Sequence, residues 1–275
     1  MHPQTEPRST GRALGFWPGV GLLVEHYWTW YRRNWRATAV SSVLQPLLFL
    51  LAFGVGFGSL IEGTGRAAEA TDGVDYLVWL APALLAVSAV QSAAFESTYP
   101  VLSGFKWQRV YHAMVAGPIS PAQVAAAHLS WVSLKLAGSG AIYIAVIAAF
   151  GGVRSPGIVV SLLAAVLTGA AVASLITAFS ATLTNEGAAF ATLFRFVVIP
   201  MTLFSGTFFP VDRLPGWVQP AVWVSPLWHG TELARAAALD RWDPLPAWGH
   251  LGYLLVLLAV GAWLAMRLFD RRLSR

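Results

Sequence analysis

Long apolar stretches alternate with short polar segments along most of the chain. A helix needs roughly 20 mostly apolar residues to cross a hydrocarbon core about 30 Å thick. Inside lipid its backbone polar groups must be satisfied within the segment itself. The pattern therefore predicts an all-α membrane protein with one transmembrane domain over residues 38–268. We expect six transmembrane helices, at residues 38–60, 76–98, 121–150, 157–184, 187–209 and 246–267.

The two ends of the chain differ from the apolar spans. Residues 1–37 are predicted to form a cytoplasmic tail followed by an interfacial helix, and residues 269–275 a second cytoplasmic tail. Residues 16–36 mix tryptophan, tyrosine and leucine with glutamate, histidine and arginine. That composition suits an amphipathic helix lying in the plane of the membrane interface. The alternative is an aromatic and basic anchor that only flanks the first span.

The segment before the last predicted span is also unusual. Residues 210–245 contain five prolines and four tryptophans. This stretch is too apolar for a free loop and too interrupted to span the membrane. Helix-like runs at 214–224 and 227–239 suit a re-entrant or interfacial hairpin on the outer face, where irregular backbone must pack on protein or line a cavity.

Composition and charge give the expected orientation. Hydrophobic residues make up 56% of the chain and charged residues 11%, against about 25% charged in soluble domains. The net charge of +5 would be compatible with nucleic-acid binding, but the basic residues gather on one side of the predicted topology. Positive charge stays cytoplasmic. We therefore expect both termini inside, in a bacterial cytoplasmic (inner) membrane, with lipids but no nucleic acid as partners. The basic residues on that side are Arg8, Arg12, Arg32, Arg33, Arg36, Lys106, Arg109, Arg267, Arg271, Arg272 and Arg275; the acids on the other side are Glu62, Glu69, Asp72, Asp75, Asp212, Glu232, Asp240 and Asp243.

The longest internal cytoplasmic connection is residues 99–120. From Phe105 to Val115 its residues are compatible with a helix, and Gly117-Pro118 is a usual stop signal. A short exposed helix between two spans is a candidate docking element for a cytoplasmic partner, and an ordinary solvated loop fits equally well. Its candidate contact residues are Phe105, Lys106, Trp107, Arg109, Tyr111 and His112.

Ionisable residues within the predicted spans are functional candidates, because burying them in a membrane is costly. Lys135 shares a helical face with His128, Ser139 and Tyr143. Glu96 is expected near the cytoplasmic boundary, at a depth closer to His128 than to Lys135. Such groups line a polar path or the base of a substrate cavity; alternatively they bond neighbouring helices or snorkel to the headgroups. The candidate substrate-path residues are Ser92, Glu96, Lys135, Arg195, Phe204 and Phe208.

Catalytic and cofactor motifs are missing from the sequence. It contains no His-Glu-x-x-His, no Gly-x-Ser-x-Gly, no glycine-rich loop ending in Lys-Ser or Lys-Thr, and no cysteine. We therefore expect no catalytic, cofactor-binding or metal-binding residues on this chain. If transport uses ATP, another chain must hydrolyse it.

Several runs resemble a known family of membrane proteins. Residues 76–85, 91–99 (with Phe95-Glu96-Ser-Thr-Tyr99) and 114–120 (with Gly117-Pro118-Ile-Ser120) resemble the nodulation-factor export branch of the ABC type-2 permeases. Residues 203–210, 214–217 and 225–227 look like the segment around the fifth span that the wider superfamily shares, which includes drug exporters. The resemblance covers about residues 20–270.

The resemblance implies an architecture and partners. Such permeases have six spans, an N-terminal interfacial helix, a coupling helix between the second and third spans and a re-entrant outer hairpin. They work as dimers, and each dimer binds two cytoplasmic ATPase subunits that hold ATP and Mg. By position, residues 105–115 become the coupling helix and residues 16–36 the interfacial helix that contacts the ATPase. The second permease is another copy or a related chain.

The implied function is the export of an amphipathic molecule, such as a lipid, lipo-oligosaccharide, polysaccharide or hydrophobic drug. No residue pattern identifies the cargo. Two other classes remain open at this point. A proton-coupled secondary transporter would use Glu96, His128 and Lys135 as a relay, and usually shows an inverted repeat, which we do not find. A membrane enzyme acting on lipid-linked sugars would need clustered acids or histidines at one interface, and the outer acids are dispersed.

Overall fold

The computed structural model describes residues 14–49, 71, 73–184 and 188–274. Every regular element in these ranges is a helix. Four stretches are long and apolar enough to cross a membrane: Tyr76–Phe105 (two consecutive helices taken together), Pro121–Ala149, Ile158–Thr182 and Pro244–Leu273. The described part of the chain thus confirms an all-helical architecture with several membrane spans. It supports four spans and does not confirm the predicted count of six.

The long helices begin where polar side chains cap them. Asp75 accepts hydrogen bonds from the backbone N–H groups of Leu77 and Val78 at the start of α4 (Tyr76–Ser97). At the start of α7 (Pro121–Ala149), Ser120 and Gln123 form a capping box. Asp243 caps α13 (Pro244–Leu273). These caps satisfy amide donors that have no partner within the helix.

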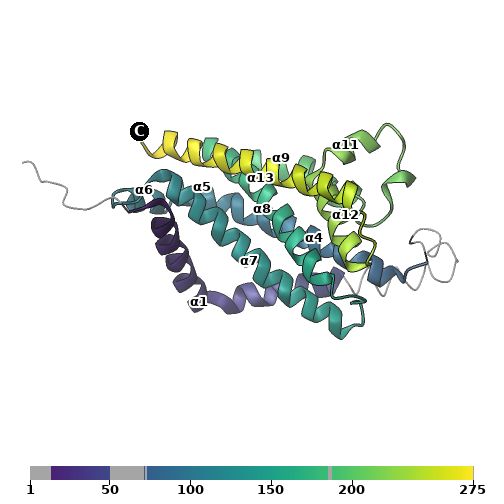
Figure 1. The fold of residues 1–275 in the computed structure, drawn as a ribbon. Coiled ribbons are helices and arrows are strands. Elements are labelled where there is room, and N and C mark those ends of the chain that lie inside the picture. The colour runs from purple at the N-terminus through teal and green to yellow at the C-terminus, as the bar shows by residue number, and fades with distance from the viewer. Residues whose placement is uncertain (1–13, 50–70, 72, 185–187, 275) are drawn as a thin grey trace, which may run out of the picture.

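Helix α8 (Ile158–Thr182) lies at the centre of the bundle. It contacts α4, α7, α13 and α12 (Pro226–Ala238), and Figure 1 shows the long helices side by side along the length of the molecule. Small residues on α8 allow this close approach. A Cβ atom at Gly169 would lie 2.5 Å from the Leu136 side chain and 3.1 Å from the carbonyl oxygen of Ala89. Glycine at this position therefore lets α8 touch two helices at once.

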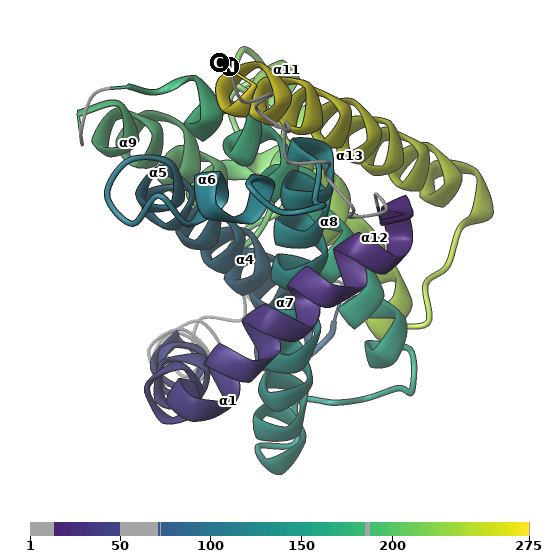
Figure 2. The same cartoon turned by 90° about the vertical axis from the view of Figure 1, so that its left-hand side faces the viewer.

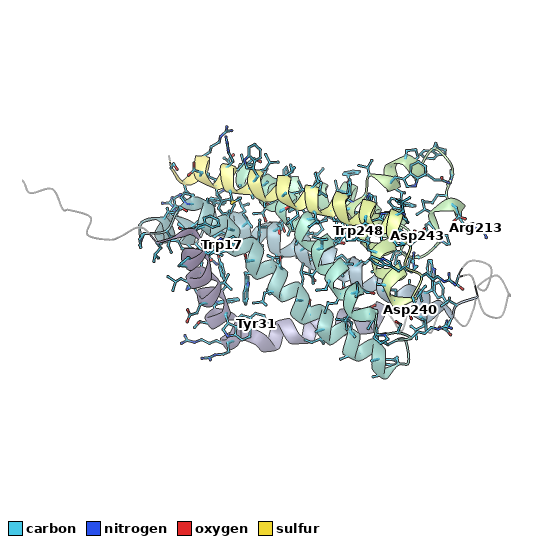
Figure 3. The ribbon with its side chains drawn as sticks, viewed as in Figure 1. Trp17, Tyr31, Arg213, Asp240, Asp243 and Trp248 are labelled. Carbon is cyan, nitrogen blue, oxygen red and sulfur yellow. The ribbon has the colours of Figure 1, made fainter. Side chains whose placement is uncertain are left out.

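Helix α1 (Phe16–Phe49) is one element with a bend. Figure 2 shows its first part crossing α7, and Figure 3 places Tyr31 at the bend. Tyr27 and Tyr31 pack on Trp131 of α7, with ring centroids 6.0 Å and 5.5 Å apart. Leu22, Glu25 and Thr29, which lie on the opposite side at 100° per residue, are exposed, so this part of α1 has one packed and one exposed face. Of the predicted first span, residues 50–60 lie outside the described residues, as do Arg8, Arg12, Glu62, Glu69 and Asp72.

The predicted fifth span at 187–209 is shorter than expected. Its helix comprises α9 (Ala188–Leu193), a π-helical turn (Phe194–Val198) and α10 (Ile199–Phe204). At a rise of about 1.5 Å per residue it is about 25 Å long, below the roughly 30 Å of a hydrocarbon core. The helix ends at Phe204 because Ser205 caps it and the following Gly206 adopts φ +75°, which does not continue a helix.

The predicted continuous helix over Phe105–Val115 is wrong. The segment forms two short helices, α5 (Tyr99–Phe105) and α6 (Val110–Val115). Residues 106–109 form a turn between them. Arg109 adopts the left-handed conformation, with φ 51°. The break brings the rings of Phe105 and Tyr111 together, at a centroid distance of 4.9 Å. A straight helix would have kept these two side chains apart.

The segment predicted as an outer hairpin, residues 210–245, holds three helices before α13: the 3-10 turn η3 (Val211–Arg213), α11 (Gln219–Trp223) and α12. Only α12 is long, and it packs against α8, α4 and α13. The last span is also longer than predicted. Helix α13 continues to Leu273 because Phe269 is fully buried and Arg272 donates to the carbonyl oxygens of Ser180 and Ala181.

Candidate functional site

The loop after α10 is tied to two helices at the α12 end of the bundle. The hydroxyl oxygens of Ser205 and Ser225 lie 2.6 Å apart, which joins the loop to the start of α12. The Tyr76 hydroxyl donates to the carbonyl oxygen of Phe208 at 3.2 Å, which joins it to the start of α4. Two hydrogen bonds therefore hold the loop, and Phe208 takes part through its backbone carbonyl.

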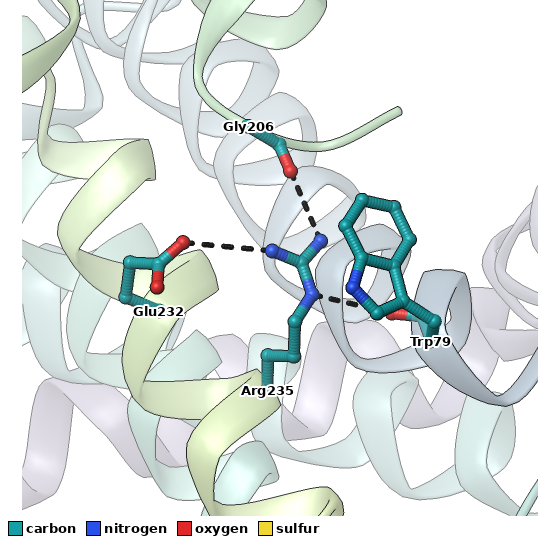
Figure 4. Close-up of polar contacts among 4 residues, drawn as sticks. All are labelled: Trp79, Gly206, Glu232 and Arg235. Atoms are coloured by element: carbon teal, nitrogen blue, oxygen red, sulfur yellow. Dashed lines mark hydrogen bonds and ion pairs between the residues drawn. The ribbon is translucent and has the colours of Figure 1, made fainter. Parts of the chain in front are cut away.

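Arg235 of α12 holds this loop from below (Figure 4). Its Nη2 donates to the carbonyl oxygen of Gly206 at 3.0 Å, and its Nε donates to that of Trp79 at 3.4 Å. The guanidinium carbon lies 3.7 Å from the centre of the Trp79 ring, in cation–π geometry. Glu232, one turn earlier, is 3.5 Å from Nη1. One guanidinium thus joins α12, α4 and the loop.

Arg235 keeps its charge in this setting. Burial lowers the pKa of its guanidinium from 12.5 to about 10, and the nearby Glu232 and Tyr76 oppose that shift. A pKa of about 10 is still well above neutral pH, so the group is a cation under ordinary conditions. The desolvated cation strengthens each hydrogen bond that it donates.

A pocket of about 440 Å³ lies beside Arg235. Its size falls in the range of small-molecule sites, about 300–1,000 Å³. Its lining mixes charge with aromatic and apolar surface, unlike a site for a purely apolar molecule. The lining residues are Trp79, Pro210, Val211, Asp212, Arg213, Trp228, Glu232, Arg235, Ala236, Leu239 and Arg241.

A second polar group lies within the bundle. Lys135 Nζ of α7 is 2.5 Å from Glu96 Oε1 of α4, and the two side chains are 17% and 31% exposed. Glu96 thus pairs with Lys135, although its depth was predicted to match that of His128 better. Side chains lean toward the N-terminus of their own helix. Because α4 and α7 run in opposite directions, Glu96 and Lys135 lean toward each other.

The remaining substrate-path candidates are spread over α4, the π-helical turn, α10 and the loop after it. Ser92 is half-buried on α4, one turn before Glu96. Arg195 lies on the π-helical turn with its side chain exposed. That turn contacts α4 through Phe95 and Phe194, whose centroids are 4.9 Å apart. The exposed Phe204 and the half-buried Phe208 lie farther along, toward the α12 end of the bundle.

The α6 end of the bundle is built on an aromatic cluster. Phe105, Tyr111 and Phe269 form it, with centroid distances of 4.7–5.3 Å, and the Arg272 guanidinium lies 4.1 Å from the Phe105 ring. Tyr111 is buried, which corrects the expectation that it is exposed, and its burial raises its pKa. Trp107, Arg109 and His112 are exposed, and Lys106 is half-buried. Of the six predicted contact residues, Phe105 and Tyr111 are therefore buried in the cluster, and the other four are at least partly exposed to solvent.

The start of α1 is attached to the same end. The Gln123 side chain donates to the carbonyl oxygens of Leu14, Gly15 and Phe16, at 3.4 Å, 3.0 Å and 3.2 Å. Gln123 also belongs to the capping box that begins α7 directly after the α6 segment. The starts of α1 and α7 therefore share one joint.

Residues 19–239 match the ABC-2 type transporter family. The matched range runs from the first turn of α1 to the residue after α12, and so includes α6 and Arg235 but not α13. The chain belongs to the ABC-2 type transporter family. It is therefore the multi-pass membrane permease of a transport system and not an enzyme. The ATPase function of such a system lies on a separate subunit.

This ABC-2 permease is similar in sequence to nodulation proteins and, over a shorter range, to a multidrug transporter permease. It is 32% identical to "Nodulation protein J" of Rhizobium meliloti (strain 1021) over 268 residues, which is 92% of this chain and 97% of that protein. "Nodulation protein J" of Rhizobium leguminosarum bv. trifolii is 31% identical over 273 residues, 97% of this chain and 100% of the relative. A shorter similarity, 32% over 84 residues, links 30% of this chain to 23% of "Probable multidrug ABC transporter permease YbhR" of Escherichia coli (strain K12).

Sequence reasoning missed the centre of the α12-end site in this ABC-2 permease. Arg235, Arg213 and Arg241 were not among the candidates, and Trp79 entered only as part of a resembling run. A signal was present, because Arg235 follows Glu232 by three residues, and residues three apart on a helix are neighbours. The two runs at 203–210 and 225–227 also meet in space, through Ser205 and Ser225.

Proposed function

We propose that this chain is the permease subunit of an ATP-driven ABC exporter. It moves an amphipathic molecule, such as a lipid, lipo-oligosaccharide, polysaccharide or hydrophobic drug, out of the cytoplasm or the inner leaflet. The proposal rests on the surface at the α6 end of this ABC-2 family chain. There, exposed Trp107, Arg109 and His112 stand on a rigid aromatic support. A rigid, basic and aromatic surface suits a protein partner.

The α6 end faces the cytoplasm of a bacterial inner membrane in this proposal. The α6 segment, the first part of α1 and the end of α13 carry the basic residues of the charge pattern, and positive charge stays inside. Both termini are then cytoplasmic, and ATP and Mg are held by the ATPase subunit. The α12 end faces outward.

Coupling follows from the joints at the α6 end. Closure of the ATPases on ATP displaces residues 105–115 and residues 16–36. Gln123 passes this displacement to α1 and α7 together, since it holds both starts. The predicted first, second and fifth spans of two permease copies then open a lateral or outward path. Glu96, Lys135 and Arg195 line its polar part.

The test has two steps. Tagged permease is first purified from native membranes, and its co-purifying proteins are identified by mass spectrometry. We expect a stoichiometric Walker-motif ATPase. An intact, folded permease that reproducibly lacks one contradicts the proposal and favours a proton-driven transporter.

The second step locates the docking surface. Trp107→Glu and Arg109→Glu should each weaken ATPase binding about tenfold, because an introduced carboxylate removes an aromatic or cationic contact at an interface. Permease-stimulated ATP hydrolysis and ATPase affinity are measured in the same preparation. The matched control is Arg154→Glu, an exposed arginine between α7 and α8 at the other end of the bundle. Equal loss in all three variants would contradict docking at the α6 end.

A further inference from the structure

The pocket beside Arg235 has a lining that selects for one kind of ligand. Three guanidinium groups, from Arg213, Arg235 and Arg241, share it with the carboxylates of Asp212 and Glu232. Guanidinium groups only donate hydrogen bonds, and ionised carboxylates only accept them. The lining thus offers both roles within a space of about 440 Å³.

Arg235 is fixed before any ligand arrives. Among the described residues, three of its N–H groups are directed at Gly206, Trp79 and Glu232. A guanidinium has five N–H donors, so two on its terminal nitrogens remain to be used. A donor already held in place loses little freedom on binding.

The pocket lining also includes apolar groups. The guanidinium of Arg235 covers one face of the Trp79 ring, which leaves Trp228 as the other indole of the lining. Trp228 is half-buried and stands with Val211 and Leu239. A ligand here therefore meets an indole ring and apolar side chains as well as hydrogen-bonding groups.

Other ligand classes fit this lining poorly. An anion would be attracted to the arginines but would meet Asp212 and Glu232 across the same space, and a cation would meet three guanidiniums. An acyl chain would cover five charged groups, and removing charges from water without new partners is costly. A hydroxyl group both donates and accepts, so an uncharged ring bearing several hydroxyls satisfies both kinds of lining group. Its C–H face suits Trp228.

We propose that this pocket binds an uncharged, hydroxyl-rich head group, such as a sugar ring, at the outer end of the permease. Binding follows from the lining alone. The further step, that the sugar is part of an exported molecule, rests on the proposed function. The pocket would then hold the polar head of the cargo beside the α12 hairpin.

The test is equilibrium binding to the full chain in phosphatidylcholine nanodiscs. Cellobiose is titrated and followed by saturation-transfer difference NMR, which detects weak ligands. Inorganic phosphate is titrated as a competitor. A third arm uses nanodiscs that contain monogalactosyl diacylglycerol. Saturable cellobiose binding that phosphate does not displace is expected. Loss of that binding in glycolipid discs identifies a lipid-linked sugar as the ligand, and its persistence identifies a free sugar.

The matched variants are Asp212→Asn combined with Arg213→Gln, and Arg154→Gln. All three side chains are exposed, so folding is preserved. The double variant should weaken cellobiose binding about tenfold or more, the effect of losing charged hydrogen-bond partners, and the control should leave it within about twofold. Phosphate binding that displaces cellobiose, no saturable cellobiose binding, or equal binding by the double variant would each overturn the proposal. None of these measurements needs ATP or a partner, so failure to find an ATPase would leave the site intact.

Discussion

Arg235 shows how one side chain can decide the position of a whole segment. It reaches α4 through Trp79 and the loop after α10 through Gly206, while its own backbone belongs to α12. Few other side chains could do this, because the flat guanidinium stacks on a ring and donates in its own plane at the same time. The segment that contains α12 is therefore positioned by a polar contact as well as by apolar packing.

Arg235→Gln should destabilise the protein by about 1.5–3 kcal/mol, the range for hydrogen bonds made by charged groups. The amide keeps some donors but loses the stacking and the second carbonyl contact. Thermal unfolding in one fixed detergent measures the effect, and Arg154→Gln serves as the exposed control. A variant as stable as the parent would show that apolar packing alone holds α12.

Glu96 and Lys135 form an ion pair in which each charge stabilises the other. Both side chains are mostly buried, so removing one leaves the other charge poorly solvated. Glu96→Gln and Lys135→Met should each lower stability. The double variant should be more stable than the sum of the two single effects predicts, by about 0.5–1 kcal/mol. This coupling energy is small because both side chains are partly exposed to solvent. Additive effects would mean that the pair does not interact. A double variant of parental stability that no longer transports would assign the pair to the substrate path.

At the scale of elements, α12 and α13 meet through two histidines. His229 Nε2 lies 2.9 Å from the carbonyl oxygen of Trp223, so that nitrogen must carry the proton. His229 Nδ1 is then the acceptor for the Nδ1–H of His250, 2.8 Å away. Tyr253 stacks on His229, with centroids 3.9 Å apart, and Glu232 lies one turn along α12. The joint is built for a neutral His229.

This joint should make stability depend on pH. Burial is the main cause that lowers the pKa of His229 below 6.5, with His250 acting in the same direction and the Trp223 carbonyl opposing it. Below about pH 6.5 the unfolded chain binds a proton that the folded chain excludes, so stability falls as pH falls. The melting temperature should drop between about pH 7.5 and pH 5.5, and drop less in His229→Gln, whose amide can replace both hydrogen bonds. An equal drop in both proteins would contradict this assignment.

The long helices were predictable because their signals are local. The predicted spans at 121–150 and 157–184 agree with α7 and α8 to within two residues at each end, since caps and continuous apolar runs define them. The break between α5 and α6 was not predictable from local sequence. It depends on Phe105 and Tyr111 meeting Phe269, which is more than 150 residues away. The Glu96–Lys135 pair was missed for a similar reason, because helix direction decides where side chains lean.

For the whole molecule, one exposed surface suits the contact between two copies that the proposed function requires. Phe196, Ile199 and Leu203 share one side of the short helix formed by α9, the π-helical turn and α10, and are 69%, 52% and 43% exposed. The exposed Arg195 lies beside them. An arginine facing lipid is costly, whereas a second permease copy could provide polar partners.

The chain contains no cysteine, so single cysteines can be introduced without background. Cysteine at 196, 199 or 203 should give disulfide-linked dimers on mild oxidation in membranes, because residues near a twofold axis meet their own copies. A disulfide needs Cα atoms within about 7 Å, so at least one of the three positions should react strongly. Cysteine at Val256 or Val260, exposed on α13, is the control. Dimers only through α13 would place the second copy on the other side of the bundle.

Helix α13 touches both working ends of the molecule. His250 lies in the joint with α12, and Phe269 lies in the aromatic cluster with Phe105 and Tyr111. About 28 Å of uninterrupted helix separates them, at roughly 1.5 Å per residue. A helix resists compression along its axis, so this strut sets the spacing between the two ends. If the α6 end shifts along the membrane normal, the hairpin must follow it, or one of these two joints must open.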